Sequence, residues 1–275
     1  MPLRCASMSI ILGIDVGGSG IKGAPVDLET GEFTADRLRI PTPEKSTPKN
    51  VARVMAQIIE HFSDDIGDAP IGLTIPAPVV HGVVPFIANL HKSWTGIHAE
   101  KFLQDALGRS FTLVNDADAA GLAEVHFGAA KGHPGLVILT TLGTGIGSAI
   151  IHRGVLIPNA ELGHLELDGH DAETRAASSI KDKEGLSYAE WAVRLQRYYS
   201  HVEMLFSPDL FVVGGGVSKD ADQFMHLLKL RTPIVPAVMR NKAGIVGAAL
   251  AARDAIEHPD MLDTTVNPEA TDPAV

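Results

Sequence analysis

Two stretches of this chain share one design, in which an apolar segment runs into a glycine-rich turn and a second apolar segment follows. The first is "SIILGIDVGGSGIKGAPVDL", residues 9–28, and the second is "GLVILTTLGTGIGSAIIHRGVLI", residues 135–157. Apolar runs of strand length around a short glycine turn predict a β-hairpin. The recurrence of this design, although weak as a repeat, indicates a protein with two similar halves.

Helical and strand patterns alternate around these hairpins. Thr47 and Pro48 can cap and begin a helix whose apolar residues share one face as far as Phe62. A helix is predicted in "HAEKFLQDALG", ending at Gly108, and a strand in "SFTLVND". After the second hairpin come a long helical pattern in "SYAEWAVRLQRYYSHVEMLF", a buried strand in "DLFVVGGG" and a small-residue helix in "NKAGIVGAALAARDAI".

This alternation is typical of the α/β class. We expect an N-terminal α/β lobe over residues 1–120 and a C-terminal α/β lobe over residues 121–257. The tail, residues 258–275, is rich in Pro, Thr and Asp, with little to bury, and we expect it to be disordered.

Composition excludes several functional classes. With 275 residues, 45% hydrophobic and 20% charged, the chain has an ordinary globular balance. The net charge of −10 argues against nucleic-acid binding. The single cysteine, Cys5, indicates an intracellular protein without disulfides, and the short apolar stretch at the start predicts no membrane segment. We therefore expect a cytoplasmic protein that begins at Met1 or Met8 and acts on small molecules.

The two glycine turns are candidates for phosphate binding. In the first, Gly17, Gly18 and Gly20 let backbone amides approach an anion, Ser19 adds a hydroxyl and Lys22 a charge. The second offers a similar set: Thr141, Gly143, Thr144 and Gly145. Either turn alone is more often a plain hairpin turn, but two such loops can grip one phosphate chain. Neither matches a Walker A loop or a Rossmann fingerprint.

Five motifs in a fixed order, "DVGGSGIK", "NDADAA", "TLGTGIGS", "ELGH" and "VVGGGVS", resemble the ROK family of repressors and sugar kinases over about the first 255 residues. Within that family, "ANLHKSWTG" and "ELGHLELDGHDAE" are similar to the polyphosphate/ATP-dependent glucokinases and glucomannokinases. The resemblance implies a two-lobed actin-like, ribonuclease H-like fold with the active site in the interlobe cleft. Many ROK proteins carry a cysteine zinc motif after the G-H pair, but this chain has no cysteine there, so we expect no structural zinc.

The resemblance also assigns sugar-site residues. Asp116 is the expected general base at the sugar O6, with Asn115 beside it on a neighbouring hydroxyl. The other expected contacts to the sugar hydroxyls are Asn89, Glu161, His164 and Glu173. From local chemistry alone, Asp116 and Asn115 would be helix N-caps and "ELGH" a strand end with a core histidine. We expect Asp118 to act as a cap and not as a second catalytic group.

On the donor side, the resemblance places Asp15 beneath the transferring phosphate, where it can orient Mg²⁺ through water. The alternative is a turn aspartate bonded to its own backbone. Gly214, Gly215 and Gly216 resemble the adenosine motif of the family, with a plain strand-to-helix turn as the rival interpretation. The cations that could line a polyphosphate path are Lys22, Lys219, Lys229, Arg231, Arg240 and Lys242.

The sequence thus predicts a hexokinase-type phosphotransferase that uses polyphosphate or ATP with Mg²⁺ to phosphorylate glucose. Mannose is expected as a second substrate because "TIPAPVV", a turn expected near the sugar entrance, has Ala77 and Pro78 where relatives often have glycine. Similar proteins are commonly dimers, so a homodimer is expected. The alternatives are an ATP-only ROK kinase for fructose, mannose or an N-acetylhexosamine, and a sugar-sensing protein without catalysis.

Overall fold

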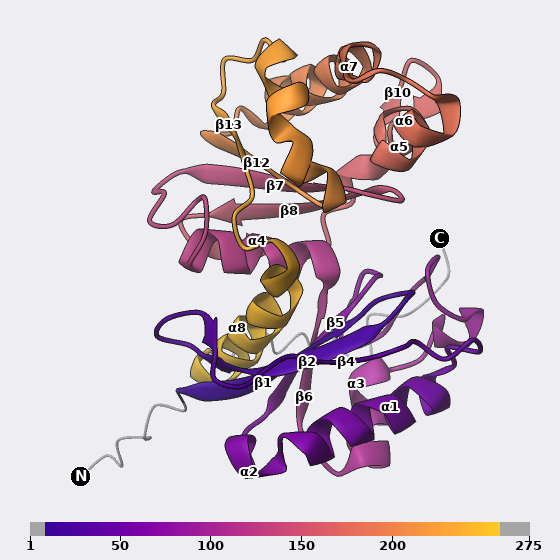
Figure 1. Ribbon diagram of the computed structural model, residues 1–275, viewed down its shortest axis with the longest axis vertical. Coiled ribbons are helices and arrows are strands. Elements are labelled where there is room, and N and C mark those ends of the chain that lie inside the picture. Colours follow the sequence, from indigo (N-terminus) through magenta and orange to yellow (C-terminus); the bar gives the residue numbers. More distant parts are fainter. Residues whose placement is uncertain (1–8, 259–275) are drawn as a thin grey trace, which may run out of the picture. The chain divides into compact units, whose positions relative to one another are not determined.

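The computed structural model describes residues 9–258, so both candidate start residues and the tail from residue 259 lie outside the described part. Within it, the chain forms two compact units (Figure 1). Unit 1 contains the residues up to 28, 33–114 and those from 248 on, and unit 2 contains 29–32 and 115–247. Each unit has its own sheet and its own core.

Unit 1 is built on a mixed sheet in the order β3-β2-β1-β5-β6, with β4 also pairing β2. The first hairpin is confirmed, because β1 and β2 pair antiparallel, with Asp15 opposite Lys22. Strand β1 also pairs β5 in parallel. The strands are β1 (Ile10–Val16), β2 (Ile21–Asp27), β3 (Glu32–Phe33), β4 (Leu38–Ile40), β5 (Ile71–Ile75) and β6 (Phe111–Asn115).

Helices α1 and α3 lie on one side of this sheet (Figure 1). The predicted start of α1 is confirmed, since the Thr47 side chain accepts a hydrogen bond from the Asn50 N–H and Pro48 is the first helical residue. The apolar face of α1 packs with sheet residues such as Leu12 and Leu73 in one core. The helical segments of this part are α1 (Pro48–His61), α2 (Ser63–Ile66), η1 (Lys92–Trp94) and α3 (Ala99–Leu107), and α3 ends at Gly108 in the left-handed conformation.

Unit 2 has a sheet in the order β13-β12-β7-β8-β9. The second predicted hairpin is formed by β7 and β8, with Leu142 opposite Ile146, and β12 runs parallel to β7. Its strands are β7 (Leu136–Leu142), β8 (Ile146–His152), β9 (Val155–Ile157), β12 (Leu210–Gly214) and β13 (Ile234–Pro236). A two-stranded sheet is formed by β10 (Glu166–Leu167) and β11 (His170–Asp171).

Helices cover both faces of the unit 2 sheet, with α4 on one side and α7 on the other (Figure 1). The α7 side contains the large aromatic side chains of the core, including Trp191, Tyr199 and Phe211. The helical segments are α4 (Asp116–His126), η2 (Leu162–His164), α5 (Glu173–Ala176), α6 (Ser178–Glu184), α7 (Tyr188–Phe206), η3 (Gly216–Gln223), η4 (Met225–Leu227) and η5 (Arg240–Lys242).

The two sheets repeat one pattern, as the sequence repeat predicts. In each, a glycine hairpin lies beside a strand that runs parallel to its first strand: β2-β1-β5 in unit 1 and β8-β7-β12 in unit 2. The carboxyl ends of β1 and β7 therefore lead into the two glycine turns.

The observed units differ from the expected lobe boundary at residue 120. The division falls between 114 and 115, at the end of β6, and α8 (Ala243–Glu257) passes from unit 2 into unit 1 at Ala248. Gly72 in β5 shows why the end of α8 belongs to unit 1, since a Cβ at this position would lie 1.9 Å from the Ala248 carbonyl oxygen. The expected lobes, residues 1–120 and 121–257, thus differ in their bounds from these two units and stay a prediction.

Candidate active site

The first glycine turn is held by side chains from the following segment. The Thr42 hydroxyl donates to the Gly17 carbonyl oxygen at 2.5 Å, and the Arg39 guanidinium donates to the Ser19 carbonyl oxygen at 2.9 Å. Gly18 and Ser19 are exposed. Because these donors bond the Gly17 and Ser19 carbonyl oxygens, two of the acceptors that would repel an anion are already occupied. The turn is suited to bind phosphate through its amides and the Ser19 hydroxyl.

Asp15 lies at the end of β1 with a partner on each carboxylate oxygen. Lys22 Nζ is 3.1 Å from Oδ2, and the buried Thr74 hydroxyl donates to Oδ1 at 2.9 Å. Lys22, expected to bind phosphate, is therefore paired with Asp15. The alternative in which Asp15 bonds its own turn backbone does not describe these two contacts, since both partners are side chains of other strands.

Asn89 is exposed in the loop before η1, and its backbone lies against the first glycine turn. A Cβ placed on Gly18 would be 3.2 Å from the Asn89 carbonyl oxygen. Trp94 anchors this loop: its side chain is fully buried and its indole N–H donates to the Ser46 carbonyl oxygen at 2.8 Å. Unit 1 thus brings together the predicted phosphate turn and one predicted sugar residue.

The second glycine turn is supported by the serines that begin α6. Ser179 donates from its hydroxyl to the Thr144 carbonyl oxygen at 2.7 Å, and Ser178 donates to the Gly143 carbonyl oxygen at 3.1 Å. The Glu173 carboxylate accepts the Ile146 N–H at 3.0 Å, directly after the turn. Glu173 lies so close to Gly145 that a Cβ there would be 2.2 Å from Oε2. Glu173, which is predicted to bind the sugar, is thus hydrogen-bonded beside the second glycine turn, which is predicted to bind phosphate.

The start of α4 shows which residue caps the helix and which carboxyl group is exposed. Asn115 is the N-cap, because its Oδ1 accepts the Ala117 N–H at 2.8 Å and the Asp118 N–H at 3.3 Å. Asp118, expected to be a cap, is instead 1% exposed inside the first turn of the helix. The cap is set by where β6 ends, and that is at Asn115. Asp116, the first helical residue, is exposed, as a proton-accepting group must be.

Glu161, His164 and Glu173 lie within electrostatic reach of one another. Burial raises the pKa of Glu161, the charge of Glu173 adds to this, and His164 opposes it. The His164 ring Nδ1 is 2.8 Å from Asp171 Oδ2, and this hydrogen bond raises the pKa of His164 above its ordinary value. His164 is exposed, so the interpretation of "ELGH" as a strand end with a core histidine is wrong.

A strongly shifted pKa marks the centre of this region. Burial raises the pKa of Asp118 to about 7, the hydrogen bond from Asn159 opposes the shift, and the charges of Glu161 and Asp116 add to it. These three carboxyl groups therefore form one electrostatic cluster within unit 2. Perturbed carboxyl groups of this kind are common at functional sites.

Known proteins of one family share extensive similarity with this chain. The model of the ROK family matches residues 11–178. The polyphosphate glucokinase of Mycobacterium tuberculosis strain H37Rv is 52% identical over 241 residues, 87% of this chain and 90% of that protein. The polyphosphate glucokinase of Mycobacterium leprae is 49% identical over 247 residues, 90% of this chain and 75% of that protein.

The chain belongs to the ROK family.

Among solved structures, the inorganic polyphosphate/ATP-glucomannokinase from Arthrobacter sp. strain KM matches with a TM-score of 0.84 and 52% identity, covering 91% of this chain and 100% of that one. The expected fold class is therefore confirmed as the mixed α/β fold of the ROK sugar kinases.

The role of the glycine run that resembles the adenosine motif of the family remains a prediction. Gly214 ends β12 and is buried, Gly215 has a φ of 83°, and Gly216 begins η3, so the run is a strand-to-helix turn in which Gly215 and Gly216 are exposed. Both the adenosine motif and the plain turn are compatible with that geometry.

The absence of structural zinc also stays a prediction for this ROK protein. Ligand atoms of His164, Asp171 and Glu173 lie within 4.8 Å of one another. Hydrogen bonds to Asp171 account for their closeness, since its Oδ2 is 2.8 Å from His164 Nδ1 and its Oδ1 accepts the Glu173 backbone N–H at 3.3 Å.

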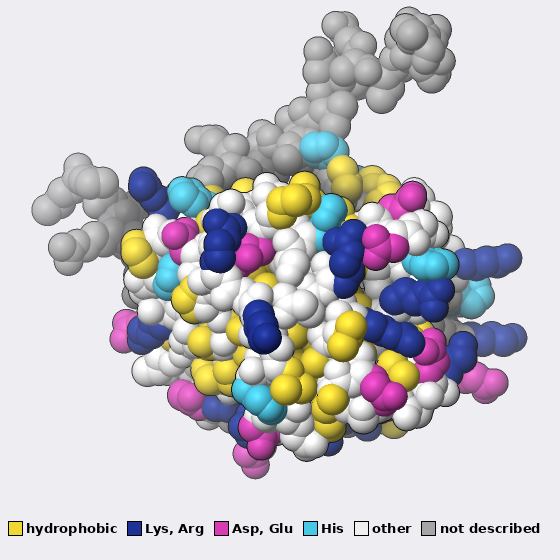
Figure 2. All heavy atoms as spheres, turned by 90° about the horizontal axis from the view of Figure 1, so that it is seen from above, with side chains coloured by type: hydrophobic (Ala, Val, Ile, Leu, Met, Phe, Trp, Pro, Cys, Tyr) yellow, Lys and Arg dark blue, Asp and Glu magenta, His cyan; other side chains and the backbone are white. Residues whose placement is uncertain are grey.

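Three of the six cations expected along a polyphosphate path lie beside carboxylates of this chain. Lys22 pairs with Asp15, Lys242 pairs with Glu32, and Arg231 lies 3.5 Å from Glu203. On the face shown in Figure 2, Lys and Arg side chains are interspersed with acidic ones. The predicted set, which also includes Lys219, Lys229 and Arg240, stays a prediction.

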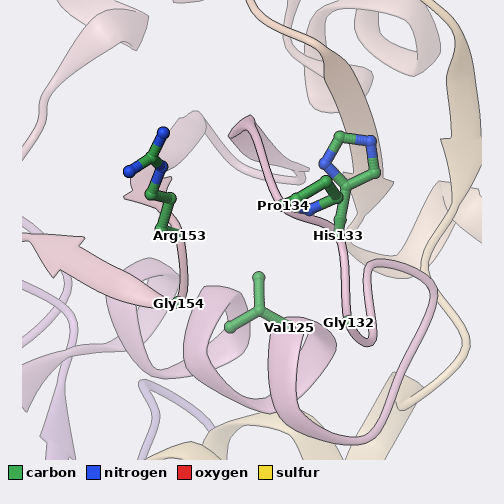
Figure 3. A pocket seen from close by; sticks show the side chains of 6 residues that line it. All are labelled: Val125, Gly132, His133, Pro134, Arg153 and Gly154. Atoms are coloured by element: carbon green, nitrogen blue, oxygen red, sulfur yellow. The ribbon is translucent and has the colours of Figure 1, made fainter.

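A hollow of about 470 Å³ in unit 2 is lined by none of the predicted site residues. Figure 3 shows Val125 of α4 beneath the loop with His133 and Pro134 and the turn with Arg153 and Gly154; Gly132 completes the lining. Arg153 follows His152, which pairs with Leu136 at the opposite end of the β7–β8 hairpin from the glycine turn. A hairpin of seven residues per strand is about 20 Å long. The hollow is therefore not the candidate active site.

Several side chains of the site were missed by sequence reasoning. Asp171 bonds His164, Thr42 and Arg39 hold the first turn, and Ser148 contacts both neighbours of Glu161. Only Asp171 had a usable signal, since it lies in "ELGHLELDGHDAE" next to the predicted Glu173. The others lie outside the motifs or act through backbone contacts that no pattern reveals.

Proposed function

We propose that this ROK protein transfers a phosphoryl group from inorganic polyphosphate or ATP to O6 of glucose and of mannose. The similarity at 52% identity to a polyphosphate glucokinase and to a polyphosphate/ATP-glucomannokinase supports this assignment of donor and acceptor. The observation that carries the chemistry is the exposed Asp116 at the first residue of α4, in one electrostatic cluster with Glu161.

In the proposed reaction, the sugar O6 attacks the terminal phosphorus of the donor. The new O6–P bond forms as the bond from phosphorus to the bridging oxygen breaks, and the O6 proton passes to the Asp116 carboxylate. Asp116 is the first residue of α4, where the helix dipole favours a negative charge. Glu161, His164 and Glu173 hold the ring hydroxyls, and Asn115 contributes the side-chain amide that its capping bonds leave over. Asn89 adds a further sugar contact.

The two glycine turns bind the donor phosphates in this proposal. Their carbonyl oxygens are tied back by Thr42, Arg39, Ser178 and Ser179, so the amides and the hydroxyls of Ser19, Thr141 and Thr144 are the groups suited to phosphate. Gly214, Gly215 and Gly216 would lie against the nucleoside when ATP is the donor.

Asp15 fits a hydrated Mg²⁺. Each of its oxygens has one protein partner, Lys22 or Thr74, and a carboxylate oxygen can accept a further bond from a metal-bound water. When bound, Mg²⁺ would neutralise charge on the transferring phosphate.

The test is a set of initial rates with glucose and mannose, each with polyphosphate and with ATP, in the presence of Mg²⁺. We expect turnover of both sugars with both donors. Activity with ATP alone would point to the ATP-only kinase, and glucose binding without turnover by either donor would point to a sugar sensor.

Asp116→Asn tests the role of the base. It should reduce kcat by at least about a hundredfold while glucose binding stays within about tenfold, because only the proton acceptor is lost. Asp64→Asn is the matched control, since Asp64 is an exposed carboxylate in the first turn of α2. Substantial activity in Asp116→Asn would contradict the assignment.

Three further parts of the proposal concern the setting of the enzyme. A homodimer is checked by light scattering of the purified chain, and the cytoplasmic location by fractionation of the host cell. Among residues 9–258, no helix is long and apolar enough to cross a bilayer. The interlobe position of the active site stays a prediction that a structure with bound glucose would test.

A further inference from the structure

Residues 159–162, which carry Glu161, are tied to the core of unit 2 at three backbone atoms. Asp118 Oδ2 accepts the Asn159 N–H at 2.8 Å. The Ser148 hydroxyl donates to the Ala160 carbonyl oxygen at 2.6 Å and accepts the Leu162 N–H at 2.8 Å. These bonds flank Glu161 on both sides.

Both tethering side chains are buried. Asp118 is 1% exposed and Ser148 is 2% exposed. Asp118 Oδ1 has no hydrogen-bond partner among the described residues. A buried carboxyl group with an unpaired oxygen destabilises a fold, and the aliphatic side chains common in cores would avoid that cost. The presence of Asp118 is therefore not explained by stability.

The tethered backbone is itself in an uncommon conformation. Asn159 has a φ of 61°, in the left-handed region. Non-glycine residues adopt that region at a cost, which surrounding contacts must offset. The bond from the Asn159 N–H to Asp118 is such a contact, and without it the segment can relax and move Glu161.

We infer that Asp118 and Ser148 are positioning residues that fix the Glu161 carboxylate for hexose binding. The inference rests on the proposed function, in which Glu161 binds the sugar ring hydroxyls. Neither residue touches the reacting atoms in this scheme. Asp118 fixes the segment before Glu161, and Ser148 fixes it on both sides. Loss of either side chain should therefore reorient the Glu161 carboxylate and leave proton transfer to Asp116 largely unchanged.

The charge state of Asp118 suits such a role. Burial raises its pKa to about 7, and the charges of Glu161 and Asp116 add to the shift. The neutral acid is therefore well populated near neutral pH, and an amide has nearly the same shape. Asp118→Asn keeps an oxygen that accepts the Asn159 N–H, whereas Asp118→Leu keeps the branched arrangement of side-chain heavy atoms and loses the acceptor.

The chain supplies a matched control for Ser148. Thr140 lies directly opposite Ser148 in the β7–β8 pair and is also buried, but its hydroxyl is 2.6 Å from the Tyr199 hydroxyl and does not contact residues 159–162. Thr140→Val thus removes a buried hydroxyl from the same region without touching the Glu161 segment.

The experiment measures KM for glucose, kcat and KM for polyphosphate in Asp118→Asn, Asp118→Leu, Ser148→Ala and Thr140→Val. We expect Asp118→Leu and Ser148→Ala to raise KM for glucose by about tenfold, with kcat and KM for polyphosphate within about threefold of the unmodified protein. Asp118→Asn and Thr140→Val should leave KM for glucose within about twofold. A KM for glucose that is unchanged in Ser148→Ala, or raised equally in Thr140→Val, overturns the inference.

Hydrogen exchange of the unmodified protein keeps the inference testable if the variants do not fold. The Asn159 and Leu162 amides should be protected, because both donate to buried side chains. Exchange at the rate of unbonded peptide groups would overturn the tethering. Failure of the proposed function is distinct from either outcome, since it would appear as no phosphorylation of glucose by the unmodified protein.

Discussion

The buried carboxyl group of Asp118 predicts an unusual dependence of stability on pH. Its pKa rises from 3.8 to about 7 on folding, mainly because of burial. A raised pKa means that the folded state binds the proton more tightly, so the contribution is favourable below pH 3.8 and is lost as pH rises toward 7. A shift of that size corresponds to at most about 4 kcal/mol, at about 1.4 kcal/mol for each pKa unit.

Asp118→Asn removes this titration and keeps the acceptor for Asn159. The unfolding free energy of the variant minus that of the unmodified protein should rise by about 3 kcal/mol between about pH 5 and about pH 8. The reason is that the unmodified protein loses the contribution of protonated Asp118 over this range, whereas the variant has no such group to titrate. Absolute stability is less informative, since many other groups titrate over the same range.

Urea unfolding of both proteins across that pH range provides the measurement, followed by two probes so that coincident transitions justify a single free energy. Asp64→Asn is the control, since an exposed carboxylate should give a difference that does not change with pH. A difference between Asp118→Asn and the unmodified protein that is constant from about pH 5 to about pH 8 would refute the reasoning.

Three further predictions follow from single contacts. In Gly145→Ala, the new Cβ would displace the Glu173 carboxylate from the Ile146 N–H, so KM for glucose should rise by about tenfold in steady-state assays, and an unchanged KM would contradict it. Asp171→Asn should lower the pKa of His164 toward its ordinary value, which NMR titration measures. In the unmodified protein, the pair of His164 and Asp171 stabilises the fold below the ordinary pKa of histidine. This stabilisation is lost as pH rises through the raised pKa of His164. Ser187→Ala should lower the unfolding free energy by about 1 kcal/mol, because it removes the capping box of α7, and calorimetry showing no change would refute this.

Much of the fold was predictable because its signals are local. The two hairpins rest on apolar runs around glycine turns, and the start of α1 rests on Thr47 and Pro48. The unit boundary was not predictable from such signals. The passage of α8 into unit 1 depends on the close approach of Gly72 to Ala248, residues far apart in the chain. Sequence periodicity indicates that this helix is buried but not which core it joins.

The motifs identified the family, but they did not settle which residue does what at the start of α4. Asn115, Asp116 and Asp118 all belong to the types that cap helices, and which one does so depends on the residue at which β6 ends. The structure gives the cap to Asn115 and buries Asp118. The sequence could not reveal this burial, because it depends on Asn159, 41 positions further along the chain.

The buried acid also bears on the proposed base. Asp116, Asp118 and Glu161 are three carboxyl groups in one cluster, and full ionisation of all three would place like charges close together. The N-terminus of α4 favours a negative charge at Asp116, which is exposed, whereas burial disfavours a charge at Asp118. Near neutral pH the neutral acid of Asp118 is therefore well populated, which reduces the repulsion that a negative charge at Asp116 would feel in the proposed reaction. An aliphatic side chain at 118 would spare Asp116 the same repulsion but could not hold Asn159, so a neutral acid meets both requirements at one position.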